Sequence, residues 1–161
     1  MAEVLYIDPT LSKSGKYEQL LSQIVALTET EKNALANMSN IIAALKYGMG
    51  YFWVGLYFVD HEELVLGPFQ GPVACTRITK GKGVCGQAWK NKKNIIVDDV
   101  NQFQGHISCN SASRSEIVIP GKNRSGEVAF VLDIDSDKLS DFDHTDENYL
   151  EKIVHLIEKL L

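Results

Sequence analysis

Residues 51–59, with the sequence YFWVGLYFV, decide the fold of this chain. A run of aromatic, aliphatic and β-branched residues interrupted only by Gly55 is typical of a buried β-strand. Side chains alternate along a strand, so the run divides into two faces. One face carries Phe52, Val54, Leu56 and Phe58, and the other carries Tyr51, Trp53, Gly55, Tyr57 and Val59. Glycine inside a strand often marks close approach by another group. We therefore expect the notch between Trp53 and Tyr57 to form a ligand wall, with ordinary sheet packing as the alternative.

A second strand is predicted at residues 127–135, where the alternation is strict. Its apolar face carries Val128, Phe130, Leu132 and Ile134, and its other face carries Ala129, Val131, Asp133 and Asp135. Strand geometry separates the two aspartates by about 7 Å. They are either part of a site or a solvated edge of the sheet.

The remaining patterns predict one α+β domain over residues 1–161. Residues 1–13 are expected to form an irregular arm, and Thr28 with Glu31 resembles a helix capping box. Helices are predicted at 14–27, 35–47, 84–92 and 146–161, and further strands at 64–66, 73–78, 94–97 and from 117. Several strands look hairpin-linked, so the sheet should be largely antiparallel. The N- and C-terminal helices should cover one face, and long loops the other.

The composition limits the classes of partner. The chain has 161 residues, a net charge of -5 and a pI near 5.3, which suggests neither a nucleic-acid nor a membrane-surface partner. No secretory signal or membrane-spanning stretch is visible, so a cytoplasmic location is expected. Three cysteines in such a chain favour redox, metal or catalytic use, or none, over a structural disulfide framework.

The loop at residues 103–116 places Cys109 three positions after His106 in a run rich in Gly, Ser and Asn. A thiol in a polar loop is more accessible than one in a strand, and accessibility favours reactivity. The alternative is a small buried hydrophobic residue. Cys85 lies near the start of a predicted helix, where the helix dipole can lower a thiol pKa. The preceding basic glycine loop, residues 80–83, lacks the spacing of a phosphate-binding loop.

If the two long strands share a sheet, these groups could meet in one pocket. Carboxylates attract a cation such as an α-ammonium group, and an indole suits an apolar or sulfur-bearing side chain. Clustered carboxylates raise one another's pKa, so one can stay protonated and act as an acid. A thiolate beside a proton donor can reduce an oxidised group, after which a second cysteine closes a disulfide. The residues thus predict a thiol-dependent reductase of a small polar molecule.

Three segments carry a family resemblance: GPFQGPVACTRITKGKGVCGQAW, FQGHISCNSASRSEIVIPG and VLDIDSD. Together they resemble the free methionine-(R)-sulfoxide reductases, which are single-domain GAF proteins. The resemblance implies that Cys109 is the nucleophile, Cys75 the resolving thiol and Cys85 an auxiliary or alternative one. Substrate would be held by Glu116, Asp133 and Asp135 at its sulfoxide or amino group, and by Trp53 and Tyr57 at its methyl-sulfur end. It also implies free methionine sulfoxide as substrate, regeneration by thioredoxin, no metal or organic cofactor, and a homodimer.

Three rival hypotheses remain open at this stage. The first is a GAF module that binds a small ligand or senses redox state without turnover. The second is a zinc site made by Cys75, Cys85, Cys109 and His106, although their spacing is wider than in structural zinc sites. The third is a Cys–His hydrolase with His106 as the base, since the sequence does not give the distance from ring to sulfur.

Overall fold

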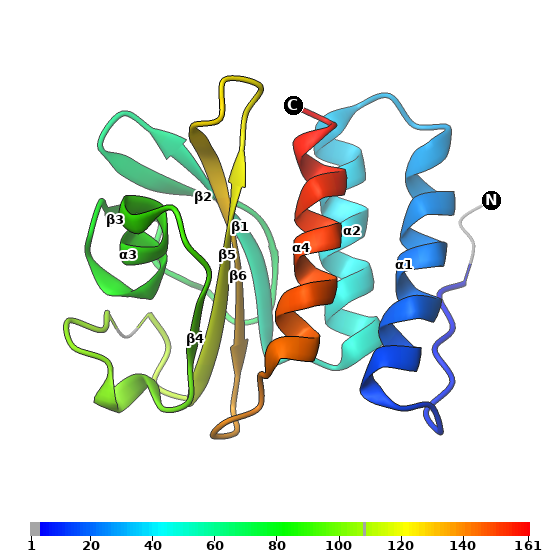
Figure 1. The fold of residues 1–161 in the computed structure, drawn as a ribbon, viewed down its shortest axis with the longest axis horizontal. Helices are drawn as coiled ribbons and strands as arrows, with labels where there is room; N and C mark the ends of the chain where they lie inside the picture. The colour runs from blue at the N-terminus through cyan, green and yellow to red at the C-terminus, as the bar shows by residue number, and fades with distance from the viewer. Residues whose placement is uncertain (1–3, 108) are drawn as a thin grey trace.

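A computed structural model describes residues 4–107 and 109–161 of the chain. It has an α+β fold in which a six-stranded sheet separates three helices from a short helix and two long loops (Figure 1). The α-helices are α1 (Lys13–Glu29), α2 (Ala34–Met49), α3 (Gly83–Asn91) and α4 (His144–Glu158). The strands are β1 (Trp53–Asp60), β2 (Glu63–Gln70), β3 (Arg77–Thr79), β4 (Ile95–Val97), β5 (Ser115–Lys122) and β6 (Val128–Ser136), and η1 (Val100–Gln102) is a 3-10 turn.

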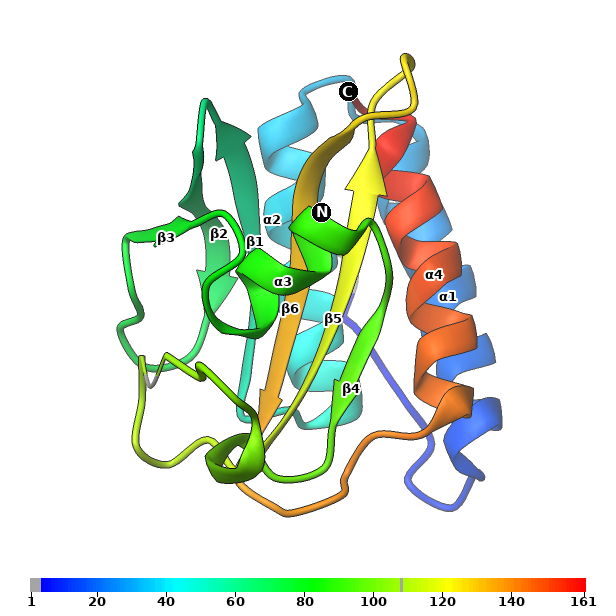
Figure 2. The same ribbon diagram turned by 60° about the vertical axis from the view of Figure 1, so that its left-hand side comes forward.

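The sheet has the strand order β3-β2-β1-β6-β5-β4, and every pair of neighbours is antiparallel. This confirms the predicted α+β class and the predicted antiparallel sheet. Figure 2 shows α3 crossing in front of β5 and β6, while α1, α2 and α4 lie behind the sheet. The terminal helices therefore cover one face, and the other face is left for α3 and the loops, as predicted.

The larger core lies between the sheet and the three terminal helices. Alternate residues of β1, β5 and β6 supply its sheet side: Val54, Leu56, Ile117, Ile119, Phe130, Leu132 and Ile134, all at most 2% exposed. Full burial of one such side chain stabilises the fold by about 1.5–3 kcal/mol. A one-residue slip of β1 or β6 would turn this set outward, so the core fixes which side chains face the opposite side.

A smaller core lies between the sheet and α3. The sheet contributes Trp53, Tyr57, Val118 and Val131, and α3 contributes Val84, Cys85, Ala88 and Trp89. All of these side chains are buried, and Lys80 Nζ lies 4.7 Å from the centre of the Trp89 ring. This packing holds α3 against the sheet and thereby sets the position of Cys85.

An anchor network joins α1, α4 and the start of β1. Asp146 accepts hydrogen bonds from Tyr17 (2.8 Å), Tyr51 (3.2 Å) and Lys13 Nζ (2.6 Å), and the two tyrosine hydroxyls also bond to each other. Asp146 is 1% exposed and also completes the capping box of α4 with Asp143. A buried carboxylate is tolerated here because its oxygens are all partnered.

Several predicted boundaries and faces are wrong. The strand predicted at residues 64–66 is longer than expected, because Gly67–Gln70 continue β2 opposite β1. Cys75 precedes β3 instead of lying in it. Thr28 and Glu31 form no capping box, since Asn33 caps α2 and accepts a hydrogen bond from Ala36.

The alternation also fails at two strand ends. Tyr51 turns into the helical core because it precedes the ladder of β1 and bonds to Asp146. In the β5–β6 pairing, Gly121 lies opposite Phe130 but Lys122 lies opposite Val128, so one residue of β6 is bulged out of register. Val128 consequently faces the α3 side and Ala129 faces the helices, the reverse of the prediction.

The described part of the N-terminal arm, residues 4–12, is irregular until Ser12 caps α1. Backbone groups of Tyr6 and Asp8 bond to the side chains of Gln23 and Gln19, which fastens the arm to α1. Residues 1–3 of the predicted arm lie outside the described residues. Among the described residues, no helix combines the length and hydrophobicity that a membrane crossing requires.

Candidate active site

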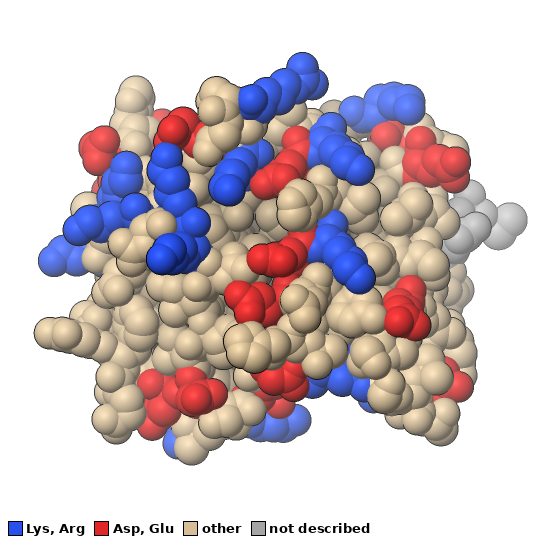
Figure 3. Space-filling model, viewed as in Figure 1, with Lys and Arg blue, Asp and Glu red and all other residues tan. Residues whose placement is uncertain are grey.

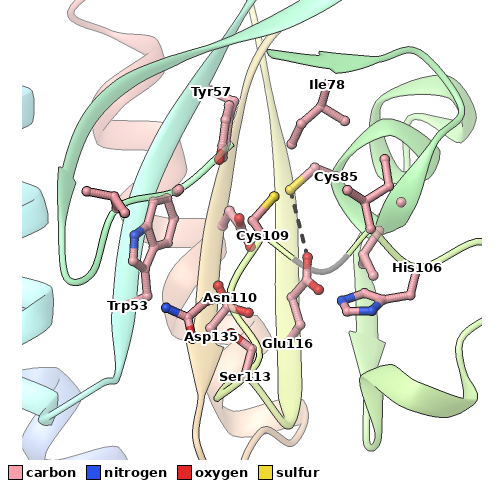
Figure 4. Close-up of a pocket in the computed structure, with 16 residues that line it drawn as sticks. Trp53, Tyr57, Ile78, Cys85, His106, Cys109, Asn110, Ser113, Glu116 and Asp135 are labelled. Carbon is pink, nitrogen blue, oxygen red and sulfur yellow. Dashed lines mark hydrogen bonds between the residues drawn. The ribbon is translucent and has the colours of Figure 1, made fainter. Parts of the chain in front are cut away.

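A pocket opens on the sheet face opposite the terminal helices, bounded by α3 and by the loop residues 71–76, 103–107 and 109–114 (Figure 4). About 530 Å³ of space not filled by atoms lies in and in front of it, open solvent at its mouth included. Its walls are formed by Trp53, Tyr57, Val73, Ala74, Ile78, Gly83, Val84, Cys85, His106, Ile107, Cys109, Asn110, Ser113, Glu116, Asp133 and Asp135.

Strand register gathers the predicted carboxylates and rings. In β6, Asp135 lies opposite Trp53 of β1 on one side and opposite Glu116 of β5 on the other. Asp133 lies opposite Gly55, two residues along the same face. Residues directly opposite in neighbouring strands have Cβ atoms about 5 Å apart. The sheet therefore aligns an indole and three carboxyl groups on the floor of one pocket.

The aromatic wall is fixed by the loop that carries Cys75. Trp53 Nε1 donates a hydrogen bond to the carbonyl of Pro72 (3.0 Å), and the Tyr57 hydroxyl donates one to the carbonyl of Cys75 (3.0 Å). The two rings lie 6.0 Å apart between centroids, and Phe69 stacks on Trp53 at 5.6 Å. The rings and the loop thus hold one another in place.

Gly55 does not leave an open notch, contrary to the sequence interpretation. A Cβ at this position would lie 2.1 Å from the Trp53 ring and 2.8 Å from Phe69 Cβ. The missing side chain makes room for the indole, which folds over the strand. Gly71 has a similar role: its φ is +140°, and a Cβ there would lie 2.5 Å from Trp53 Cδ1. The glycines therefore shape the ligand wall through Trp53.

The carboxyl groups on the pocket floor are poorly hydrated and crowded. Glu116 and Asp133 are each 6% exposed, and Asp135 is half-buried. Burial, reinforced by neighbouring carboxylates, raises the pKa of Glu116 and of Asp133 well above their ordinary values. Burial also raises the pKa of Asp135 to about 6, against a smaller lowering by a hydrogen bond from Ser113. At neutral pH the cluster retains protons and can donate one.

Two of the three cysteines are bonded to each other. Cys75 and Cys109 form a disulfide with Cα atoms 5.3 Å apart, across 34 positions of sequence. Both cysteines are half-buried, and Cys109 lines the pocket. The pairing that the family resemblance implies is therefore present in the structure, at the edge of the carboxylate floor.

Cys85 has a different environment. It is 4% exposed, and its thiol lies 3.8 Å from Oε1 of Glu116, to which it donates a hydrogen bond. Burial and the nearby carboxylates raise the pKa of Cys85 well above the ordinary thiol value. The predicted lowering by the start of α3 is wrong, because the negative pocket floor and the loss of water outweigh the helix dipole.

His106 lines the pocket, and burial lowers its pKa. Among the described residues, no hydrogen bond joins its ring to Cys109, whose sulfur is bonded to Cys75. This arrangement provides no support for a Cys–His hydrolase. The rival zinc set does not assemble either, since Cys85 is grouped with Glu116 and Asp133 and not with His106.

The structure thus brings together seven of the eight predicted site residues in one pocket and attaches the eighth, Cys75, through the disulfide. Sequence reasoning missed Asn110 and the apolar residues Ile78, Val84 and Ile107. Asn110 directly follows Cys109, which was an available signal. The apolar residues gave none, because they resemble ordinary core positions.

Comparison with known proteins identifies related chains. A family model described as "GAF domain" matches residues 27–161. "GAF domain-containing protein A" of Dictyostelium discoideum is 55% identical over 98% of this chain and 99% of its own. "Free methionine-R-sulfoxide reductase" of Saccharomyces cerevisiae is 40% identical over 92% of this chain and 87% of its own. A solved structure of free methionine-R-sulfoxide reductase from Neisseria meningitidis, in complex with its substrate, superposes with a TM-score of 0.93 at 45% identity, covering 98% of this chain and 94% of that one.

Proposed function

The chain belongs to the GAF domain family, as one of its free methionine-R-sulfoxide reductases, and from this premise we propose that it reduces free L-methionine-(R)-sulfoxide to L-methionine with Cys109 as the nucleophile. It is an oxidoreductase of that family. The observation that carries the proposal is the cross-strand alignment of Trp53, Asp135 and Glu116 beside the disulfide of Cys109.

In the first step, the Cys109 thiolate attacks the sulfur of the sulfoxide. The sulfoxide oxygen takes a proton from a carboxyl group on the pocket floor, and the oxygen is transferred to Cys109 as methionine leaves. Sulfoxide sulfur gains two electrons and the cysteine sulfur loses two, giving a sulfenic acid. The raised pKa values of Glu116, Asp133 and Asp135 support this step, because a protonated carboxyl near neutral pH is the donor that it needs.

In the second step, the Cys75 thiol attacks the sulfenic sulfur of Cys109, the S–S bond forms, and the oxygen leaves as water. The Cys75–Cys109 disulfide supports this assignment, and the structure then corresponds to the oxidised enzyme. Cys85 is a weaker candidate for the resolving thiol, because burial and the hydrogen bond to Glu116 keep it protonated.

The residues that line the pocket also account for substrate recognition. The carboxylates suit the ammonium group and the sulfoxide oxygen of a free amino acid, and Trp53 with Tyr57 suits the methyl-sulfur end. Figure 3 shows lysine and arginine side chains gathered over α3. The first residues of α3 line the pocket, so this positive charge would attract the substrate carboxylate. A residue inside a peptide has no free ammonium group to place on these carboxylates, which favours the free amino acid.

The regenerating partner is proposed to be thioredoxin, and the assembly a homodimer. Cys75 and Cys109 are half-buried residues, so the disulfide is not sealed in the core, which supports reduction by an external dithiol protein. Sedimentation velocity over a range of concentrations tests the dimer, and coupled turnover with thioredoxin and its reductase tests the partner.

One experiment tests the reaction itself. Reduced protein is incubated with the separate R and S epimers of free methionine sulfoxide and with a peptide containing the sulfoxide. Methionine and remaining thiols are then counted in a single turnover. We expect one methionine and the loss of two thiols per chain with the free R epimer alone. Binding without methionine release would instead indicate a ligand-binding GAF module.

A further inference from the structure

The thiol of Cys85 takes no part in the proposed cycle, yet it lies among carboxylates on the pocket floor (Figure 4). Cys85 Sγ and one carboxylate oxygen each from Glu116 and Asp133 lie within 4.8 Å of one another. All three residues are buried. Such a set of one sulfur and two oxygens is a possible ligand group for a divalent metal ion.

The spacing of these atoms is close to that of a zinc site. Typical Zn–S and Zn–O bonds at a tetrahedral angle put the sulfur about 3.6 Å from each oxygen and the oxygens about 3.4 Å apart. Cys85 Sγ lies 3.8 Å from Glu116 Oε1. The other two separations are at most 4.8 Å, and β5, β6 and α3 hold the backbone that carries the three residues.

An independent observation marks the same place. Asp133 is only 6% exposed, and its Oδ1 atom is buried and has no hydrogen-bond partner among the described residues. A buried acceptor without a partner costs roughly 1–3 kcal/mol. A cation bound between Asp133 and Cys85 would satisfy this oxygen.

We propose that the pocket floor is also a binding site for a zinc-type divalent cation, held by the Cys85 thiolate and the carboxylates of Glu116 and Asp133. A thiolate ligand favours zinc or cadmium over magnesium and calcium, which prefer oxygen alone. All three residues line the pocket. Binding is a ligand exchange that releases the Cys85 S–H proton together with the protons that Glu116 and Asp133 hold, and no group is oxidised.

Zinc on this floor would compete with methionine sulfoxide. This consequence rests on the proposed function, because it requires that Glu116 and Asp133 also hold the substrate. Metal binding itself does not depend on that function. The two claims can therefore fail separately.

Binding is tested on the oxidised protein. With Cys75 and Cys109 bonded, Cys85 is the free thiol of the chain, so a thiolate-to-metal signal must come from it. Cadmium should bind at one equivalent per chain and give a thiolate charge-transfer band. The protein should also take one equivalent of zinc from a chromophoric chelator. Cys85→Ser should lose the band, and Asp133→Asn should weaken zinc binding about tenfold or more.

The matched control is His155→Gln, which removes a surface histidine beside Glu158, on the opposite side of the sheet from the pocket. This variant should still bind one equivalent of metal in the pocket, as tightly as the wild type does. Retained circular dichroism and an intact disulfide identify folded variants. The metal site is overturned if the wild-type protein binds neither ion, if bound cadmium gives no thiolate band, or if Cys85→Ser binds zinc as tightly as the wild type.

Competition is tested in the Cys75→Ser/Cys109→Ser variant, which keeps Cys85 as its only cysteine and cannot turn over. Saturating methionine sulfoxide should raise the apparent Kd for zinc about tenfold or more, with alanine as a control for chelation by a free amino acid. If zinc binds as expected but the sulfoxide does not displace it, the competition is overturned, and with it the placement of the substrate on Glu116 and Asp133, while the metal site remains.

Discussion

Asp135 lies directly opposite both Trp53 and Glu116, as the central residue of three neighbouring strands. This alignment brings the aromatic wall of the pocket beside its acidic floor through strand pairing. The loops then add the sulfur chemistry, because the disulfide of Cys75 and Cys109 connects the two segments that cover the floor. Mutation can distinguish the nucleophilic sulfur of Cys109 from the resolving sulfur of Cys75, because each lies in a separate segment.

Cys109→Ser should abolish reduction of free methionine-(R)-sulfoxide even in a single turnover, because it removes the attacking sulfur. Cys75→Ser should release about one methionine per chain and then stall in the presence of thioredoxin. Quantifying methionine against protein separates the two cases, with Cys85→Ser as the comparison that keeps the Cys75–Cys109 pair. Sustained turnover by Cys75→Ser would transfer the resolving role to Cys85.

The disulfide should also make the oxidised protein more stable than the reduced one. The bond closes a segment of 34 positions, which lowers the entropy of the unfolded chain by the equivalent of about 3–4 kcal/mol in the loop-closure model. Urea unfolding of both forms at the same pH measures this difference, and the Cys75→Ser/Cys109→Ser variant should match the reduced protein. Equal midpoints for the oxidised and reduced forms would mean that closing the bond strains the two loops.

Asp135→Asn should stabilise the protein at neutral pH while slowing reduction. Burial raises the pKa of Asp135 to about 6, so the folded state binds this proton more tightly than the unfolded chain does. The free energy of unfolding therefore falls as pH rises from about 4 through 6, and ionised Asp135 costs about 1–3 kcal/mol above that range. The substitution removes this cost above pH 6 and has no such effect below pH 4.

The activity of Asp135→Asn should fall by about 10²-fold or more, because it loses a proton donor or a substrate ligand. Asp137→Asn is the matched control, since Asp137 is exposed one position beyond β6. Urea midpoints between pH 4 and 8 and single-turnover rates measure both effects. A variant of Asp135 that is destabilised at pH 7 would show that this carboxylate supports the fold.

The alternation of β1 and β6 was sufficient to place Trp53, Tyr57, Asp133 and Asp135 on one face of the sheet, whereas Glu116 of β5 was assigned through the family resemblance. A strand has only two faces, and an apolar core fixes which one is turned inward. Once Val54 and Leu132 were assigned to the helical core, Trp53 and Asp133 had to face the other way. The site could be predicted because its rings and carboxylates lie within regular strands.

Features that depend on packing between distant segments could not be predicted. Gly55 looked like an opening, and only the fold shows that the Trp53 ring fills it. Cys85 looked activated by the start of a helix, but the neighbouring Glu116 comes from β5, 31 positions away. Local sequence carries no signal for such neighbours, and burial then reverses the expected direction of the pKa shift.

Asp146→Ala should destabilise the protein strongly and leave the chemistry of the folded molecules intact. The change removes the shared partner of Tyr17, Tyr51 and Lys13 on the face opposite the pocket. Leaving buried hydroxyls and a partly buried ammonium without that partner should cost about 2–4 kcal/mol. Thermal unfolding and single-turnover rates below the transition check both parts. A large loss of rate in fully folded protein would show that the anchor network also controls the pocket.

Gly55→Ala tests whether Trp53 forms the substrate wall. The new Cβ would lie 2.1 Å from the Trp53 ring, so the ring must move away from residue 55 of β1. Overpacking of this kind costs about 1–3 kcal/mol of stability. The displaced wall should raise KM for free methionine-(R)-sulfoxide more than it lowers kcat, because the sulfur atoms and carboxyl groups stay in place. Gly15→Ala controls for the effect of losing a glycine, because Gly15 lies in α1, has no positive φ, and its new Cβ would lie 3.3 Å from Leu11 Cβ. The indole would be excluded from substrate binding if Gly55→Ala folds, shifts the tryptophan emission spectrum and leaves KM unchanged.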